Sequence, residues 1–201
     1  MDRYEDFAAL AAAARRGRDY WVAWRRRSSP VLVVAPHGGW IEPGTDRVAR
    51  AIAGRDFSWY VFLGLHYPRR RELHLTSTSF DEPRALALVA AHRWVLAVHG
   101  CGDPGEAVLL GGLDQELKEE LAAALAAAGL EARLTGHAYP GRDPCNICNR
   151  GRTGAGVQLE LTRQLRNGPR LGALVAAVRQ VLLRRTGQVP RRVWWERLFR
   201  R

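Results

Sequence analysis

The chain has 201 residues, of which 47% are hydrophobic and 25% are charged. This composition is typical of a globular chain with enough apolar material for one core, and it excludes disordered and fibrous proteins. The net charge is +11, and Lys118 is the only lysine, so the positive charge is almost entirely arginine. Such a charge attracts polyanions, a class that includes nucleic acids, anionic membranes and acidic polymers.

The cysteines and the N-terminal residues bear on the compartment. Three cysteines, Cys101, Cys145 and Cys148, are an odd and sparse set that does not resemble the disulfide framework of a small secreted domain. The first residues are acidic where a signal peptide needs basic ones. No stretch approaches the roughly 18 apolar residues of a membrane span. We therefore expect a cytoplasmic protein without a transmembrane segment.

The hydrophobic pattern alternates between helix and strand signals along the chain. In chain order we expect a helix at 5–16, strands at 20–24 and 31–35, a helix at 43–54, strands at 59–65 and 73–76, a helix at 82–91, strands at 94–98 and 108–110, a helix at 113–128, a strand at 133–137, a loop at 139–156, a strand at 157–162 and a helix at 171–185. This alternation predicts an α/β fold with a mixed, mostly parallel sheet flanked by helices. No linker divides the chain, so residues 1–201 are expected to form one domain with a basic, aromatic tail at 186–201.

Three side chains that bind metals follow predicted strands. His37 and Glu42 come after the strand at 31–35, and His99 follows the strand at 94–98. In open α/β sheets, ligands bind beyond the carboxyl ends of the strands. Two imidazoles and one carboxylate are a ligand set of hydrolytic zinc sites, which keep a fourth position open for water. A histidine at the end of a strand is also a common structural residue, so both interpretations stay open here.

Glu160 is a candidate catalytic carboxylate. Within the strand at 157–162 it lies on the face opposite the apolar side chains. A glutamate in that position can act as general base on a metal-bound water. The alternative is an ion pair with Arg163 or with another arginine.

The loop before that strand concentrates polar side chains. Asn146 and Asn149 are two of the three asparagines in the chain, and they lie beside Arg150 and Arg152. Amide donors and guanidinium groups together make a carboxylate pocket, so we expect these four residues to bind substrate. The two cysteines of the loop form a C-x-x-C pair, which is a weak metal signal without a second pair, and we favour structural or incidental roles.

Four segments of the sequence resemble a known family. The segments APHGGWIEPGTDRVARAIAG, LHLTSTSFDEPRA, VHG and NICNRGRTGAGVQLELTRQLR occur in the order seen in poly-γ-glutamate hydrolases, over about residues 4–185. That family looks like a compact relative of the zinc carboxypeptidases, which implies a mixed α/β core, one catalytic domain and one Zn²⁺ ion. The resemblance implies His37, Glu42 and His99 as zinc ligands and Glu160 as the catalytic carboxylate.

Some positions qualify the resemblance. Zinc carboxypeptidases usually hold their first two ligands as H-x-x-E, whereas the spacing from His37 to Glu42 is that of the hydrolases' HGGGIE. Trp40 replaces the third glycine of that motif and adds an aromatic wall beside the metal. Asn149 and the arginine after it are similar to the pair with which carboxypeptidases grip a terminal carboxylate. Asp81 is expected to orient a ligand histidine or to cap the following helix.

The sequence is compatible with three functions. The resemblance implies a zinc-dependent hydrolase of γ-glutamyl amide bonds, acting on poly-γ-glutamate, an anionic polymer that a basic protein attracts. An alternative is a zinc amidase acting on peptidoglycan or on small γ-glutamyl peptides. A third, of another class, is a protein that binds nucleic acid or an anionic surface through the tail at 186–201, although that tail also fits an amphipathic end packed on the body. We expect no obligate nucleic acid, and a monomer by default.

Overall fold

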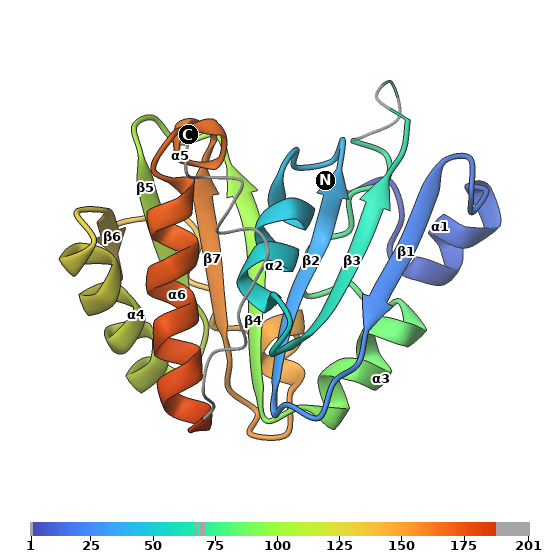
Figure 1. Ribbon diagram of the computed structural model, residues 1–201. Helices are drawn as coiled ribbons and strands as arrows, with labels where there is room; N and C mark the ends of the chain where they lie inside the picture. Colours follow the sequence, from blue (N-terminus) through green and yellow to red (C-terminus); the bar gives the residue numbers. More distant parts are fainter. Residues whose placement is uncertain (1, 67, 69–70, 188–201) are drawn as a thin grey trace.

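A computed structural model describes residues 2–66, 68 and 71–187 (Figure 1). These residues contain a sheet of seven strands in the order β1-β3-β2-β4-β7-β5-β6. The strands are β1 Tyr20–Arg25, β2 Val31–Gly39, β3 Ser58–Gly64, β4 Trp94–Cys101, β5 Ala107–Gly111, β6 Glu131–Arg133 and β7 Val157–Thr162. The pairs β2–β3, β2–β4, β4–β7 and β5–β6 are parallel, and β1–β3 and β5–β7 are antiparallel. The predicted α/β fold with a mixed, mostly parallel sheet is confirmed.

Helices cover both faces of the sheet. The helices are α1 Phe7–Ala13, α2 Thr45–Ala53, α3 Pro83–Ala91, α4 Gln115–Ala127, α5 Arg163–Asn167 and α6 Leu171–Thr186, with a short 3-10 helix, η2, at Ile147–Arg150. One face packs against α2, α4 and α6, which lie in front of the sheet in Figure 1, and the other packs against α1, α3 and η2. Because it is covered on both sides, the start of β2, Val31 to Ala35, is completely buried, and this explains its continuous apolar run. None of the described helices is long and apolar enough to cross a bilayer.

Acidic side chains start three of the helices. Asp6, Glu82 and Asp114 each accept a hydrogen bond from a backbone N–H three residues later, at 2.7, 2.8 and 2.9 Å. Such bonds satisfy N–H groups that have no partner within the first turn of a helix. The N-cap of α3 is thus Glu82, and Asp81 does not cap that helix.

Two predicted strands are wrong. Residues 73–76 form no β-strand; Leu73 and Leu75 are buried in the core on the α1 and α3 face. Their alternation therefore reflects burial on one side and not pairing with a neighbouring strand. The strand predicted at 133–137 lies instead at β6, and Gly136, with a φ of 73°, interrupts the extended backbone after it. The predicted tail falls outside the described residues from residue 188 onward.

A buried ion pair joins α6 to the end of α2. Arg179 donates to a carboxylate oxygen of Asp56 and to the carbonyl oxygen of Ile52, the latter at 2.6 Å. The two charged side chains are 5% and 2% exposed. Replacing Arg179 by methionine removes a positive charge from beside a buried carboxylate, so we expect the free energy of unfolding to fall by about 3–5 kcal/mol.

Urea denaturation of Arg179→Met measures this change. Arg184→Met is the matched control, because Arg184 lies exposed on the same helix, and we expect it to change stability by less than about 0.5 kcal/mol. Equal destabilisation by the two substitutions would show that the buried pair is not what joins these elements.

Candidate metal centre

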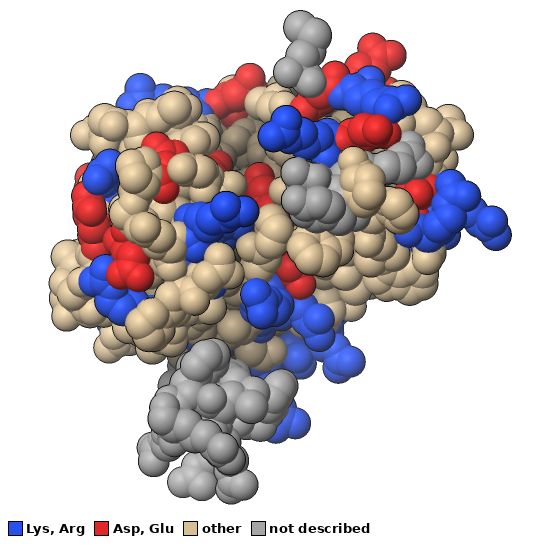
Figure 2. Space-filling model, turned by 90° about the horizontal axis from the view of Figure 1, so that it is seen from above, with Lys and Arg blue, Asp and Glu red and all other residues tan. Residues whose placement is uncertain are grey.

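The carboxyl ends of β2 and β4 bring together His37, Glu42 and His99. Figure 2 looks onto this end of the molecule, where the surface is hollowed near its middle and basic side chains lie on two sides of the hollow. Nδ1 of His37 lies 2.9 Å from a carboxylate oxygen of Glu42 and 3.1 Å from Nδ1 of His99. One ligand atom from each of the three side chains lies within 4.8 Å of the others. Two imidazole nitrogens and a carboxylate oxygen so close together are a donor set that suits Zn²⁺.

An irregularity in β2 directs His37. The register between β2 and β3 shifts between Ala35 and Gly38, so one extra residue is inserted there. A bulge of this kind re-aims the side chain next to it. The imidazole of His37 consequently lies on the α1 and α3 face, where its ring centroid is 6.2 Å from that of Phe80. The backbone then turns back, and the N–H of Glu42 donates to the carbonyl oxygen of His37 at 2.8 Å.

The second nitrogen of each imidazole is held from outside the cluster. Nε2 of His37 lies 2.7 Å from the carbonyl oxygen of Leu75. Because a carbonyl oxygen only accepts hydrogen bonds, the proton stays on Nε2 and the lone pair of Nδ1 is free for a metal. Nε2 of His99 lies 3.2 Å from the hydroxyl of Ser77. Leu75, in the segment predicted as a strand, and Ser77, just after it, therefore support the metal centre.

Glu42 is held in its charged form. Burial alone would raise the pKa of Glu42, but the neighbouring His37 and His99 outweigh it and keep this pKa well below its ordinary value. The N–H of Gly100 also donates to its second carboxylate oxygen at 2.8 Å. Glu42 therefore presents a fixed negative charge to the cluster.

Glu160 lies beside this cluster on the neighbouring strand. Parallel pairing of β4 and β7 puts it opposite His99. Burial raises the pKa of Glu160 to about 7, against the opposing effect of His99. The alternative ion pair with Arg163 is not formed among the described side chains. A carboxyl group with a pKa near neutrality can both accept and return a proton, which is the role predicted for it.

The two asparagines of the polar loop hold the loop itself. The side chain of Asn149 donates to the carbonyl oxygens of Gly141 and Asp143 at 2.8 and 2.9 Å, and its oxygen accepts from two backbone N–H groups. Asn146 caps η2 and donates to Gln158 at 2.8 Å. These amides are engaged in bonds that a connecting segment needs for its own backbone, and the structure does not direct them to the metal cluster.

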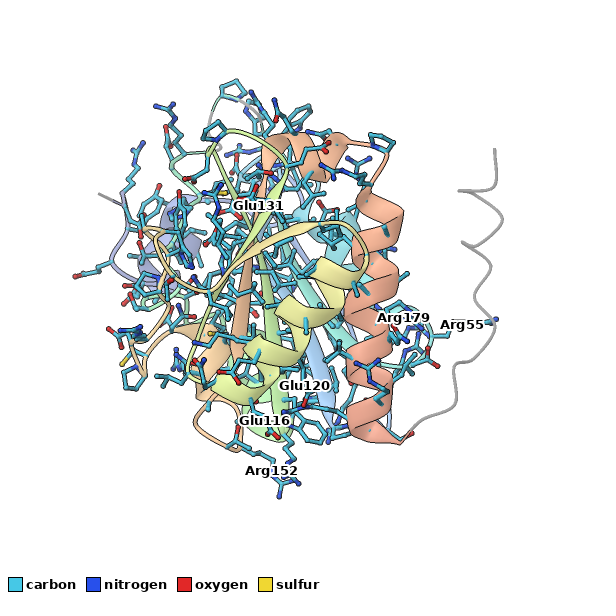
Figure 3. The ribbon with its side chains drawn as sticks, turned by 90° about the vertical axis from the view of Figure 1, so that its left-hand side faces the viewer. Arg55, Glu116, Glu120, Glu131, Arg152 and Arg179 are labelled. Carbon is cyan, nitrogen blue, oxygen red and sulfur yellow. The ribbon has the colours of Figure 1, made fainter. Side chains whose placement is uncertain are left out.

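The two arginines of that loop also have partners outside the metal cluster. Nη1 of Arg150 lies 3.4 Å from the carbonyl oxygen of Phe80. Arg152 lies before β7, and its backbone N–H donates to the carbonyl oxygen of His92, which precedes β4. Figure 3 shows Arg152 at the lower end of the molecule, opposite the carboxyl ends of the parallel strands. The structure thus does not bring Arg152 to the cluster.

Asp81 has a different partner from the one predicted. Its carboxylate accepts a hydrogen bond from the N–H of Phe7 at 2.7 Å and so anchors the start of α1. No hydrogen bond joins it to His37 or His99 in the described part of the chain. The orienting groups are the carbonyl of Leu75 and the hydroxyl of Ser77 instead.

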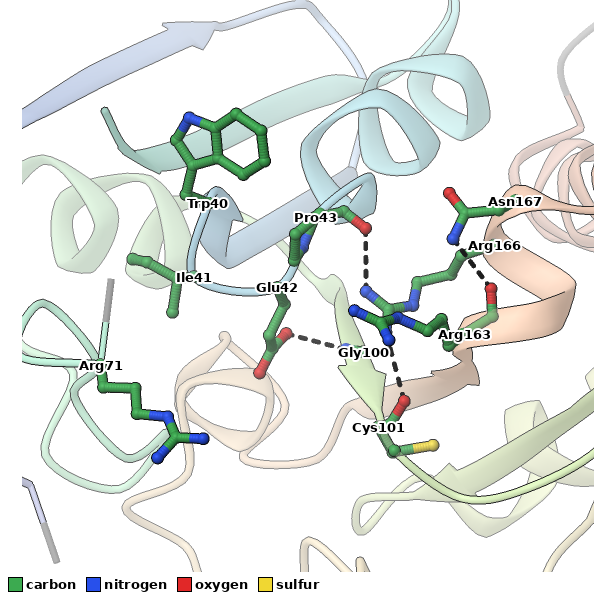
Figure 4. A pocket seen from close by; sticks show the side chains of 11 residues that line it. Trp40, Ile41, Glu42, Pro43, Arg71, Gly100, Cys101, Arg163, Arg166 and Asn167 are labelled. Carbon is green, nitrogen blue, oxygen red and sulfur yellow. Dashed lines mark hydrogen bonds between the residues drawn. The ribbon is translucent and has the colours of Figure 1, made fainter. Parts of the chain in front are cut away.

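A basic pocket, not anticipated from the sequence, opens beside Glu42. Its volume is about 610 Å³, and Arg71, Arg163 and Arg166 line it (Figure 4). Trp40 also lines this pocket. The sequence contains a signal for this pocket: Arg163 and Arg166 come just after the strand at 157–162, and ligands bind beyond the carboxyl ends of such strands.

Comparison with known proteins identifies a matching family and a related protein. The profile of the family "Poly-gamma-glutamate hydrolase" matches residues 4–168. The UPF0714 protein YndL of Bacillus subtilis strain 168 is 40% identical over 150 residues, which are 74% of this chain and 59% of YndL. The chain therefore spans about three fifths of the length of that relative.

Two solved structures are similar over nearly their whole length. A bacteriophage poly-gamma-glutamate hydrolase has a TM-score of 0.88 at 28% identity, covering 93% of this chain and 99% of that one. A zinc-free apo form of YndL has a TM-score of 0.85 at 33% identity, covering 90% of this chain and 98% of that one. Since the family profile matches most of the chain and the fold agrees over nearly all of it, the chain belongs to the poly-gamma-glutamate hydrolase family.

Proposed function

We propose that this protein is a zinc-dependent hydrolase that cleaves the γ-glutamyl amide bonds of poly-γ-glutamate. One observation carries the proposal: His37, Glu42 and His99 converge beside a pocket lined with arginines. The activity in the family's description and the zinc named for YndL point the same way. We extend the proposal to residues 1–201 acting as one catalytic domain.

The three side chains fit one zinc ion. His37 and His99 are each 2% exposed, their Nδ1 atoms face Glu42, and their Nε2 atoms have partners elsewhere. Such outer partners fix the orientation of ligand imidazoles. A zinc ion held there would supply Lewis acidity toward the substrate carbonyl and toward a water molecule.

The protein's own groups complete the chemistry. We assign to Glu160 the removal of a proton from the attacking water and its return to the leaving amine nitrogen. Its raised pKa suits both transfers near neutral pH. Arg163 and Arg166 attract the carboxylates of the substrate and hold the amide beside Glu42, so that the reaction partners stay in position.

The size distribution of poly-γ-glutamate after incubation tests this function. We expect the zinc-loaded protein to shorten the polymer, a chelator to stop the shortening, and added Zn²⁺ to restore it. Shortening that continues after the metal has been removed would overturn the metal role. An unchanged polymer with zinc bound would overturn the substrate and favour the second candidate.

That second candidate is a zinc amidase acting on peptidoglycan or on small γ-glutamyl peptides. It is favoured by Trp40, whose large side chain stands at the pocket where the related motif has glycine. Product analysis with a γ-glutamyl dipeptide beside the polymer separates the two candidates. The nucleic-acid alternative rests on the net charge of +11 and on the tail at 186–201, most of which lies outside the described residues.

A further inference from the structure

The basic pocket beside the metal centre contains three positive charges that form no ion pair. Among the described residues, Arg71, Arg163 and Arg166 have no salt bridge. Some arginines near this end of the chain do have acidic partners: Arg170 pairs with Glu106, and Arg185 lies 3.0 Å from Glu120. Unpaired guanidinium groups gathered around one pocket favour an anionic ligand.

Arg166 is fixed in place although no salt bridge to it is formed among the described residues. The residue is 6% exposed, and its two terminal nitrogens donate to the carbonyl oxygens of Pro43 and Cys101 at 2.9 and 3.2 Å. Its guanidinium lies so close to Gly100 that an added Cβ there would stand 2.3 Å from Nη1. Its Nε–H is buried and has no partner in the described structure. Native proteins seldom bury an unpaired donor without a functional reason.

Arg163 adds an exposed guanidinium on the same wall. It lies at the start of α5, three residues before Arg166, and Asn167 of the same helix also lines the pocket. Figure 4 shows Arg163 and Arg166 together on one side of Glu42 and Arg71 on the other. A guanidinium binds a carboxylate through two parallel hydrogen bonds, which fixes orientation as well as charge.

We propose that the wall formed by Arg163 and Arg166 recognises the α-carboxylate of the glutamate unit that supplies the leaving amine. In a γ-linked chain this carboxylate is attached to the carbon that bears the amide nitrogen. On the acyl side, two methylene groups and the α-carbon separate the carboxylate from the scissile carbonyl. Glu42 is one of the proposed zinc ligands, so the scissile amide would lie at the edge of the pocket that Glu42 borders. The carboxylate on the amine side is the one nearer to that amide, and the pocket reaches it first. This inference rests on the proposed function and names the group of the substrate that the site recognises.

Calorimetric titration separates this inference from the hydrolytic activity. The ligands are a short oligo-γ-glutamate and the same oligomer with its α-carboxylates converted to primary amides, each added to zinc-loaded Glu160→Gln protein and to metal-free wild-type protein. We expect the carboxylate form to bind at least about 10-fold more tightly, because charge-assisted hydrogen bonds are lost in the amide. Arg163→Gln should remove most of that preference and leave binding of the amide form unchanged.

Two variants control for folding and for net charge. Arg166→Gln should weaken carboxylate binding as well; because Arg166 is buried, the exposed Arg163 keeps the test decisive if that variant does not fold. Arg184→Gln removes the same charge from the exposed face of α6 and should leave both affinities unchanged. Equal affinities for the two oligomers, or equal losses in Arg163→Gln and Arg184→Gln, would overturn the proposal. A carboxylate preference without cleavage would instead contradict the proposed function alone.

Discussion

Glu160→Gln should lower kcat for poly-γ-glutamate by about 10²–10⁴-fold, which is the contribution typical of a general base. The glutamine keeps the shape of the side chain but cannot accept the proton of the attacking water. Because Glu160 belongs to β7 and is not among the three clustered side chains, we expect the zinc content to stay at the wild-type level. Metal analysis and steady-state kinetics on the same sample check both statements.

Glu131→Gln serves as the control for this variant. Glu131 is an exposed carboxylate at the start of β6, so the substitution makes the same chemical change away from the cluster. We expect its kcat to match that of the wild type. If Glu160→Gln turned over at the rate of this control, Glu160 would have no part in proton transfer, and the raised pKa would be a consequence of burial alone.

His99→Ala should lose zinc binding and activity together. The substitution removes one of the three ligand atoms that lie within 4.8 Å of one another. Loss of an outer partner of a ligand costs about 10–100-fold in metal affinity, so loss of a ligand itself should cost more than about 100-fold. Competition with a chelator of known affinity measures the change in the zinc dissociation constant.

Two further variants make this result specific. Ser77→Ala removes the hydroxyl next to Nε2 of His99 and should weaken zinc binding by about 10-fold, less than loss of the ligand. His66→Ala removes an exposed histidine outside the cluster and should leave the zinc affinity unchanged. Thermal unfolding of the metal-free proteins checks that each variant is folded. Unaltered zinc affinity in a folded His99→Ala protein would contradict the assigned ligand set.

The class of fold and the cluster at the carboxyl edge of the sheet follow from local patterns along the sequence. Continuous apolar runs such as residues 31–35 indicate strands buried on both faces, and the structure confirms that burial. Because parallel neighbours end at the same edge of a sheet, polar residues after two such strands meet there. That rule predicts that His37, Glu42 and His99 lie close together. Parallel pairing of β4 and β7 places Glu160 beside them.

Which other polar side chains reach that edge depends on the packing of the whole chain. Asn149 and Arg152 are close in sequence, yet the first is locked into the loop's hydrogen bonds and the second lies at the opposite end of the sheet. Arg163 and Arg166 come from a short helix and converge with Arg71, which is distant in sequence, around one pocket. Local patterns report which face of an element is buried. They do not report which backbone groups will form hydrogen bonds with an asparagine side chain. They also do not report which distant segments will meet, because both depend on how the whole chain packs.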